Sequence, residues 1–208
     1  TMRKIDETTL PTPAEKLSIM RYTIDYMESK GYKMIGMDHF AKPKDELFLA
    51  IEKWELHRNF QGYTPKGGAD LIGIGLTSIG EGVDYYAQNH KEMESYEAAI
   101  DAGKLPFERG VALNEDDRIR QYVIMELMSN FKLDIVRFES MFGVTFSTYF
   151  SDALESLKPF EKDELLIITP QSIECSPTGT LLIRTIAMAF AAYMHVHAKS
   201  AKTFSLTV

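Results

Sequence analysis

The sequence predicts a mixed fold, α/β in its first half and mostly helical from Asn114 onward. Two observations predict it. In the first half, amphipathic helical segments alternate with short apolar segments that end in polar residues, a pattern typical of α/β folds. In the second half, helices with caps surround a single candidate hairpin. The first half has too few strands to close a sheet by itself.

The first-half elements begin with a helix at Thr12, where Pro13 suits the first helical position and Glu15 completes a capping box. Its apolar residues recur at helical spacing, and Gly31 ends it. The apolar stripe comprises Leu17, Met20, Ile24 and Met27. We then expect a buried strand at 32–37, a helix at 42–54, an irregular stretch at 57–65, a second buried strand at 71–74 and a helix at 91–102.

The second-half elements begin with a helix that Asn114 caps and that runs to Ser129. Further helices are predicted at 135–142, at 146–157 and from 181 to about 198. The second of these ends before Pro159. A hairpin is predicted at 165–169 and 172–176. Three helices, a hairpin and a helix give the outline of a winged-helix module.

Composition restricts the function classes. Lys and Arg number 23 against 30 Asp and Glu, a net charge of −7, and neither half of the chain is basic. The helix at 146–157, which a winged-helix module would place in a DNA groove, carries no basic residue, so we expect no nucleic-acid binding. The longest apolar run, 181–192, is interrupted by Arg184 and is too short to cross a bilayer. We expect no membrane span, no signal peptide and a cytoplasmic location.

The single cysteine, Cys175, excludes an intramolecular disulfide and any multi-cysteine metal site built by this chain alone. Glu174 beside it favours a packing role over a nucleophilic one. We expect His195 and His197, two apart in a helical context, to be surface residues and not a metal pair. The aromatic residues Phe138, Phe142, Phe146, Tyr149 and Phe150 recur at helical spacing and are expected in the core.

The glycines at 73, 75, 80 and 82 do not match a dinucleotide-binding or P-loop spacing, because Ser78 stands where the third glycine of GxGxxG would be. We expect them instead to let the chain approach a neighbouring backbone or a ligand closely.

Several runs, in order and nearly over the full length, resemble the oxygen-independent coproporphyrinogen III oxidases, which are radical S-adenosylmethionine (SAM) enzymes. The runs are Ile35-Gly36-Met37-Asp38-His39-Phe40-Ala41-Lys42-Pro43, His57-Arg58-Asn59-Phe60-Gln61-Gly62-Tyr63, Asp70-Leu71-Ile72-Gly73-Ile74-Gly75, Tyr86-Ala87-Gln88-Asn89, Arg109-Gly110, Asn130-Phe131-Lys132-Leu133-Asp134 and Leu182-Ile183-Arg184. The resemblance implies that residues 1–112 are the last units of a partial (β/α) barrel and that 113–208 form a helical, winged-helix-like cap.

The resemblance also implies an activity for the full-length enzyme. In that family a [4Fe–4S] cluster on a CxxxCxxC motif and two SAM molecules generate radicals that convert two propionates of coproporphyrinogen III into vinyl groups, giving protoporphyrinogen IX. The cysteine triplet is missing here. We therefore expect this chain to be the C-terminal segment, inactive alone, with no cofactor bound, no catalytic residue and no metal ligand of its own.

Two positions carry over from the family as SAM contacts, Gln61 and Ile79. Three others depart from its usual pattern, Thr185 and Ala191 in the last helix and Glu164 before the hairpin, where the family usually has glycine. Because a truncated barrel leaves strand edges unpaired, we also expect self-association. The alternative function is a winged-helix module for protein partners, with nucleic acid as the weaker option.

Overall fold

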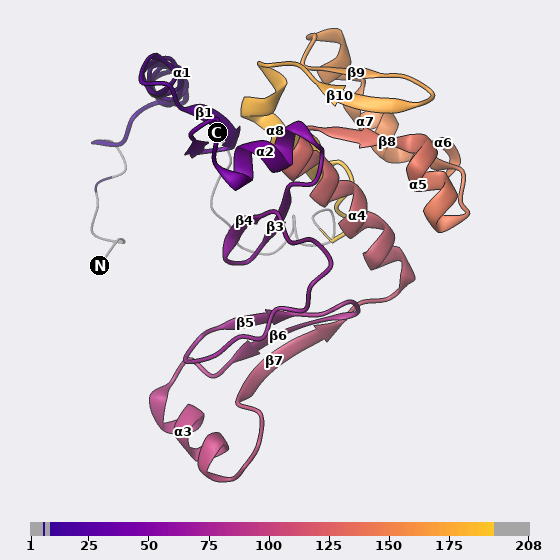
Figure 1. Ribbon diagram of the computed structural model, residues 1–208. Helices are drawn as coiled ribbons and strands as arrows, with labels where there is room; N and C mark the ends of the chain where they lie inside the picture. The colour runs from indigo at the N-terminus through magenta and orange to yellow at the C-terminus, as the bar shows by residue number, and fades with distance from the viewer. Residues whose placement is uncertain (1–5, 7–8, 194–208) are drawn as a thin grey trace.

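The computed structural model describes residue 6 and residues 9–193, and its N-terminal third combines one long helix with two strand pairs (Figure 1). Its elements are α1 (Pro13–Ser29), β1 (Lys33–Gly36), β2 (His39–Ala41), α2 (Glu46–Glu52), β3 (His57–Asn59) and β4 (Gly62–Thr64). The predicted capping box is present, because the Glu15 amide donates to Thr12 Oγ1 at 3.3 Å and the Thr12 amide donates to Glu15 Oε2 at 2.8 Å. Asp45 caps α2, so that helix begins later than predicted.

A three-stranded antiparallel sheet follows, made of β5 (Ile79–Glu81), β6 (Tyr85–Asn89) and β7 (Phe107–Ala112). It projects from the remainder of the molecule, and α3 (Met93–Asp101) lies at its far end (Figure 1). Buried Asn89 ties the preceding loop to the sheet, since its Nδ2 donates to the carbonyls of Gly73 and Gly75 at 3.1 and 2.8 Å. The close backbone approach predicted for the four glycines is confirmed at Gly73 and Gly80, where a Cβ would lie 3.0 Å from the Ile79 carbonyl carbon and from the Leu71 carbonyl oxygen. It is not found at Gly75, where a Cβ would meet nothing within 4 Å, or at Gly82, where the nearest atoms to a Cβ would be those of the Tyr85 side chain.

The first-half strand predictions need correction. The predicted strand at 71–74 is wrong: Leu71 makes only an isolated bridge to Glu81, and Ile72 and Ile74 are 78% and 84% exposed. A buried strand needs neighbours on both sides, whereas among the described residues this segment pairs with β5 at Leu71 and has no further ladder. The stretch at 57–65, expected to be irregular, is the β3–β4 hairpin. The strand at 32–37 exists as β1, but it pairs antiparallel with β2. Every strand pairing in the described part is antiparallel.

The helical second half contains α4 (Glu115–Asn130), β8 (Lys132–Asp134), α5 (Ile135–Phe142), α6 (Phe146–Tyr149), α7 (Ser151–Lys162), β9 (Leu166–Ile168), β10 (Ser172–Cys175), a 3₁₀ turn η3 (Gly179–Leu182) and α8 (Ile183–Met188). Asn114 caps α4 as predicted, and the hairpin β9–β10 is confirmed. β8 adds to β10, which gives a three-stranded sheet of order β8-β10-β9.

Two helix predictions in this half are wrong in extent. The helix expected at 146–157 is interrupted at buried Phe150, and its second part continues through Pro159 to Lys162. The last helix ends at Met188 within the described residues, whereas the prediction extended it to about residue 198; His195 and His197 lie outside the described residues. Glu164, where the family usually has glycine, adopts a left-handed φ of 56°.

The core is concentrated in this second half and contains four fully buried phenylalanines, Phe138, Phe146, Phe150 and Phe190. Their rings contact one another at centroid distances of 5.0 to 6.2 Å. The core role predicted for the aromatic group is therefore confirmed, with Phe142 and Tyr149 packed at its edge.

Candidate functional site

The β3–β4 hairpin positions Gln61, the first of the two predicted SAM contacts. Phe60 and Gln61 form its tip, where Asn59 Oδ1 accepts hydrogen bonds from the amides of Gln61 at 2.8 Å and Gly62 at 3.2 Å. Gly62 has a φ of 139°, which a residue with a Cβ rarely adopts. The tight tip leaves the Gln61 side chain exposed, so its amide is available both to donate and to accept hydrogen bonds.

Ile79, the second predicted contact, is the first residue of β5 and is half-buried. It faces Gln88 across the strand pair, and Glu81 faces Tyr86. Because alternate residues of a strand point to one side and directly opposite residues share a face, Ile79, Glu81, Tyr86 and Gln88 lie on one face of the sheet. Arg109 of β7, opposite Gln88, extends this face, and its Nε donates to Gln88 Oε1 at 2.8 Å.

The structure brings the hairpin tip onto this face through one ring contact. The Phe60 ring meets the Tyr86 ring edge-on, with centroids 5.2 Å apart and planes 84° apart. Gln61 is adjacent in sequence to Phe60, and Ile79 lies on the strand beside Tyr86. The two predicted residues, 18 positions apart in the chain, therefore belong to the same region of the surface.

Polar groups around Tyr86 make this face electrostatically distinct. The Tyr86 hydroxyl donates to Glu81 Oε1 at 3.4 Å and accepts from Gln121 Nε2 of α4. Glu81 Oε2 is buried and has no hydrogen-bond partner among the described residues. Burial raises the pKa of the Glu81 carboxyl, and burial together with the nearby Glu81 charge raises the pKa of Tyr86 to about 12. We call Phe60, Glu81, Tyr86 and Gln121 the Tyr86 cluster.

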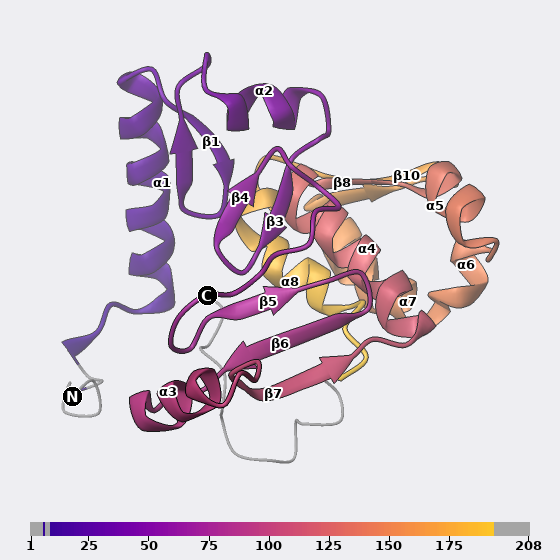
Figure 2. The ribbon, with the colours of Figure 1, turned by 60° about the horizontal axis from the view of Figure 1, so that its bottom comes forward.

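The hairpin is also anchored to the helical half. Tyr63 Oη donates to the Met128 carbonyl at 3.3 Å, and Asn130 Nδ2 donates to the Leu56 carbonyl at 3.2 Å. The Lys132 ammonium lies 3.9 Å from the centroid of the Trp54 ring. Figure 2 shows β3 and β4 beside α4. The hairpin is therefore held between the projecting sheet and the helical half.

Sequence reasoning missed Phe60, Tyr86 and Gln121 as members of this region. Tyr86 and Phe60 both stand in runs that carried the family resemblance, and that was the available signal. Gln121 gave none, because its place on α4 does not reveal which face of the helix meets the sheet.

The described residues do not fit an iron–sulfur cluster. A [4Fe–4S] cluster is held by clustered thiolates, and the sequence has only Cys175. That thiol is half-buried in β10 and packs against the core of the helical half, which confirms the packing role; burial also raises its pKa to about 12. No group of three or more His, Cys, Asp or Glu suited to a metal occurs within the part of the chain that the structure describes.

SAM contacts are a different case, because the donor set suits a polar ligand with an apolar part. The exposed Gln61 amide, the apolar side chain of Ile79 and the unpartnered oxygen of Glu81 occur in one region. These residues fit a portion of a SAM site.

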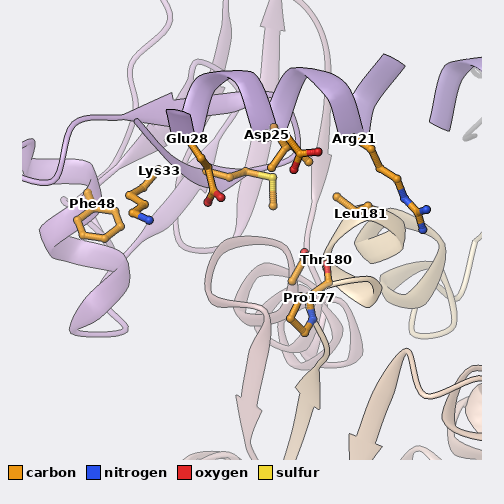
Figure 3. Close-up of a pocket in the computed structure, with 10 residues that line it drawn as sticks. Arg21, Asp25, Glu28, Lys33, Phe48, Pro177, Thr180 and Leu181 are labelled. Atoms are coloured by element: carbon orange, nitrogen blue, oxygen red, sulfur yellow. Dashed lines mark hydrogen bonds between the residues drawn. The ribbon is translucent and has the colours of Figure 1, made fainter. Parts of the chain in front are cut away.

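One cavity lies elsewhere, between α1 and the turn before η3. It has a volume of about 370 Å³, and Figure 3 shows Arg21, Asp25 and Glu28 of α1 above Pro177, Thr180 and Leu181. Neither Gln61 nor Ile79 lines it. The cavity is therefore separate from the region predicted from the sequence.

No helix in residues 9–193 is long and apolar enough to cross a membrane.

Comparison with known proteins shows which proteins this chain resembles. Residues 113–182 match the family model described as the HemN C-terminal domain. The oxygen-independent coproporphyrinogen III oxidase of Helicobacter pylori J99 is 53% identical over 194 residues, and that of Escherichia coli K12 is 43% identical over 197. Over nearly its whole length, this chain is similar to the oxygen-independent coproporphyrinogen III oxidases.

The match covers nearly all of this chain but less than half the length of each oxidase. It covers 93% and 95% of this chain but 42% and 43% of the H. pylori and E. coli oxidases. A solved structure titled coproporphyrinogen III oxidase (HemN) from Escherichia coli, a radical SAM enzyme, superposes with a TM-score of 0.87 at 44% identity, covering 92% of this chain and 44% of that one. The resemblance predicted from the sequence is confirmed, whereas the SAM contacts of Gln61 and Ile79 stay predictions.

Proposed function

We propose that this chain is the C-terminal segment of an oxygen-independent coproporphyrinogen III oxidase. The similarity to the solved E. coli enzyme over 92% of this chain carries the proposal. In the reaction, each of two propionates of coproporphyrinogen III loses a hydrogen atom, one electron and CO₂, and becomes a vinyl group. When bound in the complete enzyme, SAM and a [4Fe–4S] cluster supply the radical that takes the hydrogen atom.

Within this enzyme, residues 1–112 form the last units of the partial barrel and residues 113–208 the winged-helix-like cap. The three-stranded sheet β8-β10-β9 on α4 and α5 supports the cap assignment. The hairpins before residue 112 do not themselves support the barrel assignment, because their strands pair antiparallel whereas barrel strands pair parallel. The single, half-buried cysteine supports a reducing, cytoplasmic setting.

The chain's own contribution is to bind and orient SAM. The exposed Gln61 amide offers a donor and an acceptor to a polar ligand, and Ile79 offers an apolar surface beside it. The chain alone is inactive and binds no cluster, because it lacks the thiolates that hold one.

The proposal is tested in a chimaera in which this chain replaces the matching segment of the E. coli oxidase. After anaerobic reconstitution, SAM-dependent conversion of coproporphyrinogen III to protoporphyrinogen IX is expected. Gln61→Ala should raise the KM for SAM or lower turnover. Gln171→Ala is the matched control, since Gln171 is an exposed glutamine in another hairpin turn. A well-folded chimaera without product would contradict the proposal.

A separate experiment tests the isolated chain. We expect no iron uptake on anaerobic reconstitution with iron and sulfide. A brown species with about four irons per chain would overturn the assignment of the cluster to another segment.

The alternative is an interaction module built on the winged outline of the second half. Its helix α7 carries three acidic residues against two lysines, one of them paired with Glu155, so it lacks the basic face that a phosphate backbone needs. Salt-dependent duplex binding in the micromolar range would favour this alternative.

A further inference from the structure

The Tyr86 side chain connects three segments that are distant in the sequence. Its ring contacts Phe60 at the β3–β4 tip, while its hydroxyl joins Glu81 of β5 and Gln121 of α4. Tyr86 itself stands on β6 and is half-buried. Tyr86 therefore touches the hairpin tip, the sheet and the helical half.

The hydroxyl acts in both directions, which the ring alone cannot do. It donates to one oxygen of Glu81, whose other oxygen already lacks a partner among the described residues, and it accepts from the Gln121 amide. Removing the Tyr86 hydroxyl leaves both oxygens of the Glu81 carboxylate without a hydrogen bond among the described residues, and it leaves the Gln121 amide donor unpaired. Because unpaired buried polar groups are costly, the three segments should then separate or rearrange.

The position of Gln61 depends on the same contact. Phe60 is 55% exposed, so its ring gains its fixed position from Tyr86 and not from burial in the core. The turn hydrogen bonds to Asn59 shape the tip, but they lie within the hairpin and do not orient it toward the sheet. The Phe60–Tyr86 contact does so.

We propose that Tyr86 is a positioning residue: it holds the Phe60–Gln61 tip over the sheet face that carries Ile79, and Gln121 fixes its hydroxyl from the helical half. The effect on SAM binding rests on the proposed function, whereas the positioning of the hairpin tip is a property of this chain alone. Tyr86 thereby couples the cap to the region that contacts SAM.

The first test measures positioning in the isolated 208-residue chain. Amide hydrogen exchange of residues 57–64 should accelerate about tenfold in Tyr86→Leu and less in Tyr86→Phe, which keeps the ring, while exchange in α5 and α7 should not change. Tyr85→Phe is the matched control, because Tyr85 precedes Tyr86 on β6 and points to the opposite face. Unchanged exchange of 57–64 in both Tyr86 variants would overturn the proposal.

The second test uses the chimaera and separates positioning from general stability. Tyr86→Phe, which removes both hydrogen bonds of the hydroxyl, should raise the KM for SAM about fivefold and change kcat less than about twofold. Gln121→Ala should do the same, and the double variant should be no worse than either single one. Additive effects would show that Gln121 does not act through Tyr86.

The outcomes of the two proposals are distinguishable. A chimaera without product contradicts the proposed function, whereas hydrogen exchange of the hairpin still decides whether Tyr86 positions the tip. Full activity with an unchanged KM in Tyr86→Phe and Tyr86→Leu would leave the oxidase assignment intact and overturn the role of Tyr86.

Discussion

Truncation of Phe138 should destabilise the helical half more than any exposed substitution. Its side chain is fully buried, and its ring contacts those of Phe142, Phe146 and Phe150 at centroid distances of 5.1, 5.2 and 5.9 Å. Phe138→Ala removes the buried ring and leaves a cavity, which typically costs about 3–5 kcal/mol. The loss of several aromatic contacts, each worth about 0.5–1.5 kcal/mol, places our expectation in the upper part of that range.

Urea unfolding measures this loss. With an m-value of about 2 kcal/mol per molar, the midpoint should fall by about 2 M. Trp54, the single tryptophan, reports the transition by fluorescence because Lys132 of β8 lies over its ring. Phe107→Ala on the exposed strand β7 is the control and should cost less than about 1 kcal/mol. A Phe138→Ala midpoint within the range of this control would refute the assignment of Phe138 to the core.

Three further predictions follow from charge, burial and strand edges. Burial raises the pKa of the Glu126 carboxyl, so its ionisation costs stability above that pKa. Glu126→Gln can still accept the hydrogen bond from Asn130 and should stabilise the chain in thermal melts at pH 7. The advantage should be lost as the pH falls below about 4, where both side chains are neutral. An equal gain at pH 3 would contradict this cause. Because burial raises the pKa of the Cys175 thiol to about 12, iodoacetamide at pH 8 should modify it far more slowly in the folded chain than in urea, and equal rates would contradict its packing role. All six residues of β7 are exposed at a sheet edge, so sedimentation velocity should show self-association that Val111→Lys weakens; a monomer at all concentrations would sink this prediction.

The elements that local signals specify could be predicted from the sequence. Thr12 and Asn114 carry capping boxes, and the structure has both helices where these residues place them. The aromatic spacing around Phe138 also predicted the core, because residues three and four apart share one face of a helix.

Other elements depended on partners that local patterns do not reveal. The apolar segment at 71–74 has strand composition, but in the described residues it meets β5 only through the Leu71 bridge, and Ile72 and Ile74 stay exposed. Pro159 predicted a helix end, yet α7 continues to Lys162, with Leu157 buried and Phe160 packed against the core. Packing there outweighs the hydrogen bond that proline removes.

The sequence by itself determined the resemblance to the oxidases, through the runs around Gln61 and Tyr86, and it excluded a cluster site built by this chain, since one sulfur cannot replace three. Only the tertiary structure decided that Phe60 packs on Tyr86 and that Gln121 reaches the same hydroxyl. The reason is geometric: the side chain chemistry is written in the sequence, but contacts between residues 60, 86 and 121 exist only after a hairpin, a sheet and a helix have packed together.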